Sequence, residues 1–250
     1  MDDVSRETPA VPEMARKVFR PDRLPLAEAY AALLATEGVV RGLIGPREAP
    51  RLWDRHILNC AVLAELLPEG STVADIGSGA GLPGLVLAIH RPDLQMTLIE
   101  PLLRRTTFLT EVVERLHLDN VEVVRGRADV LHGVRTFDVV TSRAVAPLAR
   151  LLEWSMPLVG ADGALVAMKG SSITTEIEAA RDVLARFGCA EPTVSTLGDR
   201  LLAETTLAVR VAWADPSKVG LTSVPTAARR REASSQDGKQ KARTKRRKNT

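Results

Sequence analysis

The sequence predicts an α/β protein with a doubly wound, mostly parallel seven-stranded sheet that follows N-terminal helices. Three observations support this fold class. From residue 72 onward, short apolar runs of strand length alternate with stretches of helical periodicity. The first run leads into a glycine-rich turn and then a helix, a common ligand-binding arrangement in such sheets. A short loop around Gly198 and Asp199 joins the last two runs, so one of these strands is expected to be antiparallel.

Two helices are expected ahead of the sheet. Apolar residues recur at helical spacing over 24–37, and Gly38 follows as a stop signal. Pro50 opens a second helix that runs to about residue 67. Residues 1–23 show no clear period, and we expect them to form a flexible leader. The predicted organisation is this leader (1–23), one domain (24–213) with a helical N-terminal part (24–70), and a disordered basic tail (214–250).

The elements of the sheet region follow from apolar runs and their periodicity. Strands are expected at 72–76, 95–99, 121–124, 137–141, 163–168, 193–197 and 205–213. Helices are expected at 83–90, 101–117, 148–158 and 173–187. In this arrangement a ligand belongs at the carboxyl ends of the parallel strands.

Composition narrows the functional class. Hydrophobic residues make up 45% of the chain, enough for a core, and aromatic residues only 3%, so Leu, Val and Ala must build it. The two cysteines, Cys60 and Cys189, lack the spacing of a disulfide framework or a zinc site, and the four histidines do not cluster. We therefore expect no metal, and the lack of a nucleophile elbow argues against a hydrolase.

The distribution of apolar residues along the chain indicates where in the cell the protein is located. The N-terminal residues include no apolar segment like that of a signal peptide. No run approaches the roughly 18 apolar residues of a membrane span. We expect a cytoplasmic protein with no membrane partner, and a monomer.

Charge is distributed unevenly along the chain. Residues 229–250 carry a net charge of +8, so the remainder carries −5 within a total of +3. The segment is rich in Ser, Gln, Gly and Lys and has no apolar periodicity, which predicts disorder and attraction to polyphosphate. It is either an RNA-binding arm or a solubilising extension.

The turn at 75–84, DIGSGAGLPG, admits two cofactor interpretations. Residues 79–84 fit G-x-G-x-x-G, which would indicate an NAD(P)-dependent oxidoreductase, although this glycine run does not come directly off the strand. Read from Asp75, the turn is D-x-G-x-G-x-G, which resembles the first motif of S-adenosylmethionine-dependent methyltransferases. A carboxylate suits that cationic cofactor, and Gly77 and Gly79 would let the backbone approach it closely. The third interpretation is that the glycines serve packing alone.

Polar residues follow the other parallel strands. Glu100 comes directly after the second strand, where a carboxylate can accept hydrogen bonds from both hydroxyls of an adenosine ribose. After the third strand, Ala128 would make room for the adenine and Asp129 would meet its amino edge, unless Asp129 caps a helix or turn. Arg143 follows the fourth strand. It would contact the cofactor carboxylate, an RNA phosphate or a guanine O6, or else form half of a surface ion pair. Lys169 closes the fifth strand and would be a phosphate contact.

Four motifs together resemble the glucose-inhibited division protein B family. They are LWDRHIL at 52–58, DIGSGAGLPG at 75–84, SRAVAP at 142–147 and AMKG at 167–170, in the family's order and spacing over about 24–213. The resemblance implies a class I (Rossmann-like) methyltransferase that transfers a methyl group from S-adenosyl-L-methionine to N7 of a guanine in the 530 loop of bacterial 16S rRNA, with the rRNA or the small ribosomal subunit as partner. It places the cofactor contacts on Gly77, Leu82, Ala128, Asp129 and Arg143.

The chain departs from that family's common pattern in one helix. Many members carry an acidic residue and Ser where this chain has Asn59 and Cys60. The basic tail also lies outside the shared region. The role of the helix that carries residues 52–58 is therefore not carried over from the resemblance.

The implied reaction needs no general base, because guanine N7 carries a lone pair and no proton. The candidate catalytic residues are Arg143, which would hold the RNA, and Asp54. Asp54 or Asp75 would stabilise the positive charge that develops on the product ring, while capping its own helix is the alternative role for Asp54. On the residues alone, two other functions stay open: an NAD(P)-dependent oxidoreductase and a non-catalytic RNA-binding protein.

Overall fold

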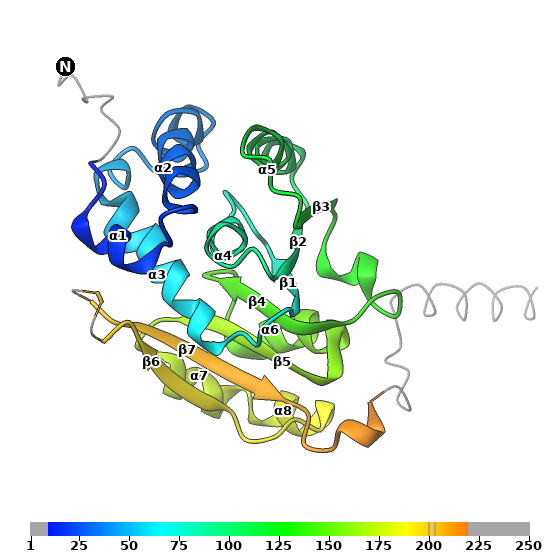
Figure 1. Cartoon of the computed structure of the whole chain (residues 1–250). Coiled ribbons are helices and arrows are strands. Elements are labelled where there is room, and N and C mark those ends of the chain that lie inside the picture. The colour runs from blue at the N-terminus through cyan, green and yellow to red at the C-terminus, as the bar shows by residue number, and fades with distance from the viewer. Residues whose placement is uncertain (1–9, 200, 203, 220–250) are drawn as a thin grey trace, which may run out of the picture.

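The computed structural model describes residues 10–199, 201–202 and 204–219, which form a seven-stranded sheet with helices on both faces (Figure 1). The strands are β1 (Thr72–Ile76), β2 (Gln95–Glu100), β3 (Val121–Arg125), β4 (Phe137–Arg143), β5 (Val159–Lys169), β6 (Thr193–Leu197) and β7 (Thr206–Ala212). Their order is β3-β2-β1-β4-β5-β7-β6, and only the pairs that involve β7 are antiparallel. The predicted fold class is confirmed, and β7 is the antiparallel strand.

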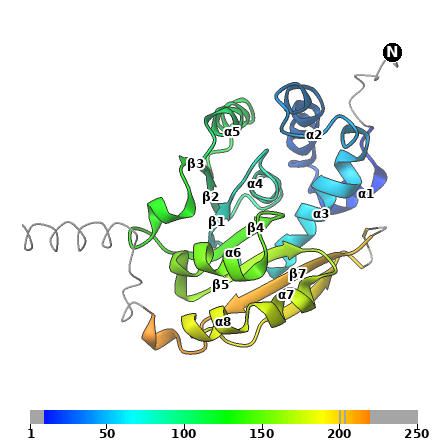
Figure 2. The same cartoon turned by 180° about the vertical axis from the view of Figure 1, so that it is seen from behind.

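Helices cover the two faces of the sheet separately (Figures 1 and 2). One layer contains α1 (Glu13–Val18), α2 (Leu24–Leu33), α3 (Leu58–Ala61), α4 (Gly84–His90) and α5 (Leu103–Arg115), which share one apolar cluster. The other contains α6 (Leu148–Ser155), α7 (Ile173–Ala179) and α8 (Arg181–Phe187), which pack into a second cluster. The direction of winding changes between β1 and β4, so the carboxyl ends of these two strands mark the expected ligand site.

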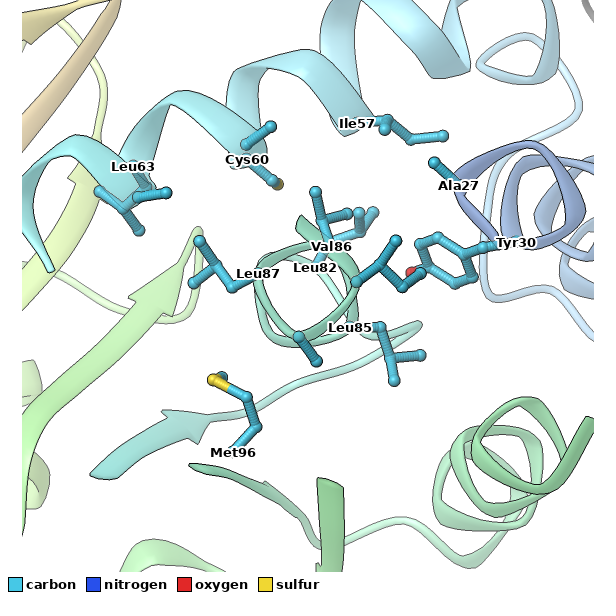
Figure 3. Packing of buried hydrophobic residues seen from close by; sticks show 14 of the residues in the cluster. Ala27, Tyr30, Ile57, Cys60, Leu63, Leu82, Leu85, Val86, Leu87 and Met96 are labelled. Carbon is cyan, nitrogen blue, oxygen red and sulfur yellow. The ribbon is translucent and has the colours of Figure 1, made fainter. Parts of the chain in front are cut away.

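Helix α4 lies inside the first layer. Its residues from Gly84 to Ile89 are all buried, because the helix is apolar on every side. Figure 3 shows it between Tyr30 of α2, Cys60 of α3 and Met96 of β2. The N-terminal helices are therefore part of the same core as the sheet.

The predicted flexible leader is wrong for the described residues from 10 to 23. Residues 13–18 form α1, in which Ala15 is buried, and Phe19 after it is 2% exposed. The Phe19 ring packs edge-on against the rings of Trp53 and His90, with centroids 6.5 and 5.2 Å apart. A helix of six residues is too short to show a hydrophobic period in sequence, which is why the pattern missed it.

The predicted tail also begins too early. Residues 214–219 are ordered around the 3-10 turn η7 (Pro216–Lys218), and the N–H of Ala214 donates to the carbonyl of Gly188. The Asp215 side chain accepts a hydrogen bond from Ser217 N–H at 3.1 Å and caps this turn. The basic part of the tail lies outside the described residues.

Most other differences concern element boundaries. The predicted helix at 24–37 ends as a π-helical turn, η1 (Leu34–Gly38), and the one at 50–67 is a chain of short helical segments, η2 (Ala49–Arg51), η3 (Leu52–Ile57), α3 and η4 (Val62–Leu66). The predicted helix at 173–187 divides at Ala180 into α7 and α8. Within the described residues, we find no helix with the length and apolar character needed to span a bilayer.

Candidate active site

Asp75 lies near the carboxyl end of β1 and is fully buried. Its Oδ2 accepts a hydrogen bond from the N–H of Gly84 at 3.0 Å, whereas its buried Oδ1 has no hydrogen-bond partner among the described residues. Burial raises the pKa of Asp75 to about 7, although the Gly84 N–H opposes this shift. An orphaned carboxyl oxygen at the switch point suits a ligand with a donor or a positive charge.

At two positions of the turn that follows Asp75, the surrounding atoms leave little or no room for a side chain larger than that of glycine. A Cβ at Gly84 would lie 2.3 Å from Leu98 Cδ2 and 2.6 Å from Asp75 Oδ2, so α4 starts too close to the sheet for any side chain. Gly77 has φ +68°, and its Cβ would lie 3.0 Å from Cγ2 of Val145 in the loop after β4. The turn thus approaches both the sheet and the β4 loop.

Glu100 ends β2 and is 1% exposed. Its Oε2 accepts a hydrogen bond from Gly79 N–H and its Oε1 accepts one from Leu102 N–H, each at 3.0 Å. Arg105 Nη1 lies 3.4 Å from Oε2. Backbone N–H groups therefore orient the carboxylates of both Glu100 and Asp75 at the glycine turn. Each carboxylate oxygen still has a lone pair that can accept a hydrogen bond from a hydroxyl group of a ligand.

Ala128 and Asp129 begin the short 3-10 helix η5 (Ala128–Leu131) after β3. Ala128 is buried and the Asp129 side chain is exposed. Arg127 occupies the N-cap position of η5 and no side chain caps it, so the alternative role of Asp129 as a cap is not supported. The predicted adenine contact thus remains the role to test.

Arg143, the last residue of β4, contacts the helical segment that precedes β1. Its Nη2 bonds to Nδ1 of His56 in η3, and its Nη1 lies 3.3 Å from Sγ of Cys60 in α3. The other His56 nitrogen, Nε2, lies 2.8 Å from Oε2 of Glu48. The alternative role of Arg143 as half of a surface ion pair is not supported, since its neighbours are a histidine and a thiol.

The N-terminal helices reach the glycine turn through Tyr30. Its hydroxyl donates to the carbonyl oxygen of Ala80 at 2.8 Å, and the ring is completely buried (Figure 3). Burial is also the largest cause that raises the pKa of Tyr30 well above its usual range. The phenol is therefore a permanent hydrogen-bond donor that fixes the turn from outside the sheet.

Lys169 is not the free phosphate contact that its place at the end of β5 predicts. Its Nζ donates to the carbonyl of Ala146 at 2.8 Å and to Glu176 Oε2 at 2.7 Å. The same Glu176 oxygen accepts the N–H of Leu148 at 2.8 Å. Burial raises the pKa of Glu176, but Lys169 and this N–H outweigh burial and the pKa is lowered overall. Lys169 and Glu176 therefore anchor the loop after β4.

Asp54 is exposed on η3, two residues before buried His56. Its alternative role as the cap of that segment is not supported, because the N-cap is Arg51 and no side chain caps it. Residues two apart point to different sides of a helix, so Asp54 lies away from the His56 contact with Arg143. The structure does not bring the two candidate catalytic residues together.

Several residues at this site had no signal in the sequence. Glu48, Cys60 and Tyr30 reach the site only through tertiary packing from the N-terminal helical part. Leu102 and Val130, which neighbour Glu100 and Asp129 in sequence, are 48% and 49% exposed apolar side chains. Within the described part of the chain, no group of three or more His, Cys, Asp or Glu side chains could hold a metal ion.

Comparisons with known proteins agree with this geometry. The sequence profile of the GidB family, described as rRNA small subunit methyltransferase G, matches residues 23–202. Curated proteins named ribosomal RNA small subunit methyltransferase G are similar to the chain: one from Nocardioides sp. is 66% identical over 94% of this chain and 93% of its own length, and one from Thermobifida fusca is 52% identical over 86% and 90%.

A solved structure shows the same fold. The M. jannaschii TYW2 in complex with AdoMet superposes with a TM-score of 0.50 at 17% identity, over 62% of this chain and 74% of that chain. At this identity the likeness concerns the fold alone. The profile and the relatives, however, cover nearly the whole of the sheet domain. The chain therefore belongs to the GidB family of rRNA small subunit methyltransferase G proteins.

Proposed function

We propose that this protein transfers a methyl group from S-adenosyl-L-methionine to N7 of a guanine in the 530 loop of 16S rRNA. The observation that carries the proposal is Asp75 at the switch point of a methyltransferase-type sheet: its Oδ2 bonds to the glycine turn at Gly84, and its buried Oδ1 has no partner among the described residues. A positively charged amino group would give this oxygen its missing partner and favour its ionised form. Membership of the family supports the reaction and its RNA substrate.

The residues present fit the cofactor. Asp75 would meet its amino end, Glu100 its ribose hydroxyls, and Ala128 and Asp129 its adenine. Gly77, Gly79 and Leu82 form the turn beside it, and Leu102 adds an apolar surface near Glu100. When bound, the cofactor supplies an electrophilic methyl group on a sulfonium.

The chain's own task in catalysis is alignment. Guanine N7 has a lone pair and no proton, so no side chain needs to remove one. Holding the two reactants in line contributes up to about 7–11 kcal/mol in favourable cases. Arg143 would hold the RNA or the cofactor carboxylate at the end of β4. Of the two candidate carboxylates, buried Asp75 at the glycine turn, rather than exposed Asp54, would stabilise the developing positive charge.

The NAD(P) alternative is not supported, because the turn has few donors free for a pyrophosphate. Gly79 N–H donates to Glu100 and Gly84 N–H to Asp75. The N–H groups of Gly77, Gly81 and Leu82 donate to backbone carbonyls. Two buried carboxyl groups would also repel a dianionic pyrophosphate. A non-catalytic RNA-binding protein is likewise not supported by the family to which the chain belongs.

The partner would be 16S rRNA or the small ribosomal subunit. The domain would span 24–213 with α1 packed onto it, act as a cytoplasmic monomer without metal or membrane partner, and use the basic segment 229–250 as an RNA-binding arm. This segment's charge of +8 would neutralise phosphates and make binding dependent on salt.

The decisive experiment is methyl transfer from labelled S-adenosylmethionine to small ribosomal subunits from cells that lack this protein, followed by nucleoside digestion and mapping. Label in 7-methylguanosine at the 530 loop is the expected result. Label in another nucleoside would refute the N7 assignment, and label at another position would refute the target. Asp75→Asn protein serves as the negative control.

A further inference from the structure

A hydrogen-bonded chain links the N-terminal helical part to the end of β4. Oε2 of Glu48 lies 2.8 Å from Nε2 of His56, and Nδ1 of the same imidazole bonds to Nη2 of Arg143. His56 is 8% exposed, whereas Glu48 and Arg143 are half-buried. His56, whose side chain can be neutral or protonated, thus lies between the carboxylate of Glu48 and the guanidinium of Arg143.

Only one state of His56 satisfies both contacts. A guanidinium has donors and no acceptor, so Nδ1 must accept from Arg143 and cannot carry a proton. The proton of the ring then lies on Nε2, from which it is donated to the carboxylate of Glu48. In the other neutral tautomer, the Nδ1–H of His56 and the guanidinium of Arg143 would both be donors and could not bond to each other. A protonated His56 would in addition be repelled by the positive charge of Arg143.

We propose that Glu48 and His56 are positioning residues for Arg143, with His56 working as the neutral Nε2–H tautomer. Glu48 fixes that tautomer, and His56 in turn holds the guanidinium beside Cys60, at the carboxyl end of β4. The inference rests on the proposed function for its effect on methyl transfer, because Arg143 matters there as a contact to cofactor or RNA. The tautomer itself can be tested without substrate.

The surroundings favour this neutral state. Burial is the largest cause that lowers the pKa of His56, followed by the charge of Arg143, while Glu48 opposes both. Arg55 on the same segment lowers it further. The titratable groups that in turn interact with Arg143 are Tyr30, Cys60 and Asp75. His56 is therefore neutral at physiological pH, and acidification would disrupt the chain of contacts.

The direct test uses the purified full-length protein without ligand. Long-range proton–nitrogen NMR spectra of histidine-labelled protein, with His56 assigned by its loss in His56→Asn, should show nitrogen Nδ1 unprotonated and Nε2 protonated at pH 7.5. In Arg143→Met the pKa of His56 should rise, because a neighbouring cation is gone. A protonated Nδ1 in the wild type, or an unchanged pKa in Arg143→Met, overturns the proposal.

The functional test separates positioning from simple packing. We expect kcat of the wild type to decline at acid pH as His56 gains a proton. His56→Asn keeps an acceptor near the place of Nδ1 but cannot titrate, so it should retain more activity than His56→Leu and lose this decline. Glu48→Leu should lower kcat/KM by about tenfold, or about 1.4 kcal/mol, through loss of the fixed tautomer.

His132 is the matched control, because its Nε2 bonds to the carbonyl oxygen of Trp154 at 2.9 Å, away from Arg143. His132→Asn should stay within about twofold of the wild type, well below the tenfold loss expected for Glu48→Leu. Equal losses in His56→Asn and His56→Leu, or an unaltered pH profile in His56→Asn, contradict the positioning role. Failure of the wild type to methylate rRNA would refute the proposed function, and the NMR result would still decide the tautomer.

Discussion

The N–H of Gly84 and Oδ2 of Asp75 lie 3.0 Å apart, and this bond joins the first turn of α4 to the end of β1. It exists because residue 84 has no side chain. Gly84→Ala would place a methyl group 2.3 Å from Leu98 Cδ2, so either α4 or the strand must move. Overpacking of this kind costs about 1–3 kcal/mol, which denaturant unfolding can measure. Gly170→Ala, in open space, should change stability little; an equal loss there would contradict the packing argument.

Gly77 can be tested against a glycine of the same backbone conformation. Gly77 has φ +68° and Gly133 has φ +72°, but only Gly77 faces a side chain, Val145. Alanine at either position should cost about 1–2 kcal/mol of stability for the left-handed backbone. Only Gly77→Ala should also weaken S-adenosylmethionine binding, by about tenfold, as measured by calorimetry. Similar affinities for the two variants would place the cofactor elsewhere.

Binding of the cofactor should depend on pH through Asp75. Its pKa of about 7 means that the carboxylate that attracts the cofactor's amino group is mostly protonated at pH 6. We expect affinity to increase by about tenfold between pH 6 and pH 7.5. Asp75→Asn should bind weakly throughout this range, and a flat profile in the wild type would exclude Asp75 as the contact.

Stability of the free protein should show the opposite trend. The native pKa of Asp75 is raised from 3.8 to about 7, so between these values the folded state binds more protons than the unfolded state. The contribution of Asp75 to stability therefore falls as pH rises through this window, by at most about 4 kcal/mol. Asp75→Asn should raise the melting temperature at pH 8 more than at pH 5.

Lys169 should matter through the loop it anchors. Its side chain is 8% exposed and its ammonium group bridges Ala146 and Glu176, so Lys169→Met leaves a carbonyl and a carboxylate without their donor. We expect a loss of about 2–4 kcal/mol in denaturant unfolding. The exposed pair of Lys218 and Asp215 provides the control, since Lys218→Met should cost less than about 0.5 kcal/mol. If Lys169→Met cost as little stability as Lys218→Met, the contacts of Lys169 with Ala146 and Glu176 would not stabilise the fold.

The basic tail should contribute to RNA affinity alone. Deletion of residues 229–250 removes a net charge of +8. The dependence of rRNA binding on salt should become shallower, by up to about 0.7 in slope for each phosphate that the protein no longer neutralises. Filter binding over a range of salt concentrations measures this slope. Cofactor affinity should not change, and a weakened cofactor affinity would mean that the tail reaches the sheet domain.

The sheet could be predicted well because its strands are short apolar runs between clear turn signals. Strand β1 and strand β6 have the predicted boundaries, and β7 is the expected antiparallel strand. The errors lie where local pattern carries little information. Helix α1 is too short to show a period, and the break at Ala180 between α7 and α8 interrupts a helix whose hydrophobic spacing continues across it.

The site was predictable only in part, for a similar reason. Strand ends and the glycine turn are adjacent in sequence to their strands, so Asp75, Glu100 and Arg143 could be found from topology. Contacts over longer separations could not. His56 and Cys60 meet Arg143 from 87 and 83 residues away, and Tyr30 meets the carbonyl of Ala80 from 50 residues away, separations that no local spacing rule covers.

The complete enclosure of α4 limits how this protein can be divided. The helix that follows the glycine turn has no apolar face toward water, since the sheet covers one side and Tyr30 and Cys60 contribute to the cover on the other (Figure 3). A fragment that begins at β1 would expose the apolar side chains of this helix to solvent, and we expect it to aggregate. In evolution or in engineering, the N-terminal helices and the cofactor turn must therefore be inherited as one piece.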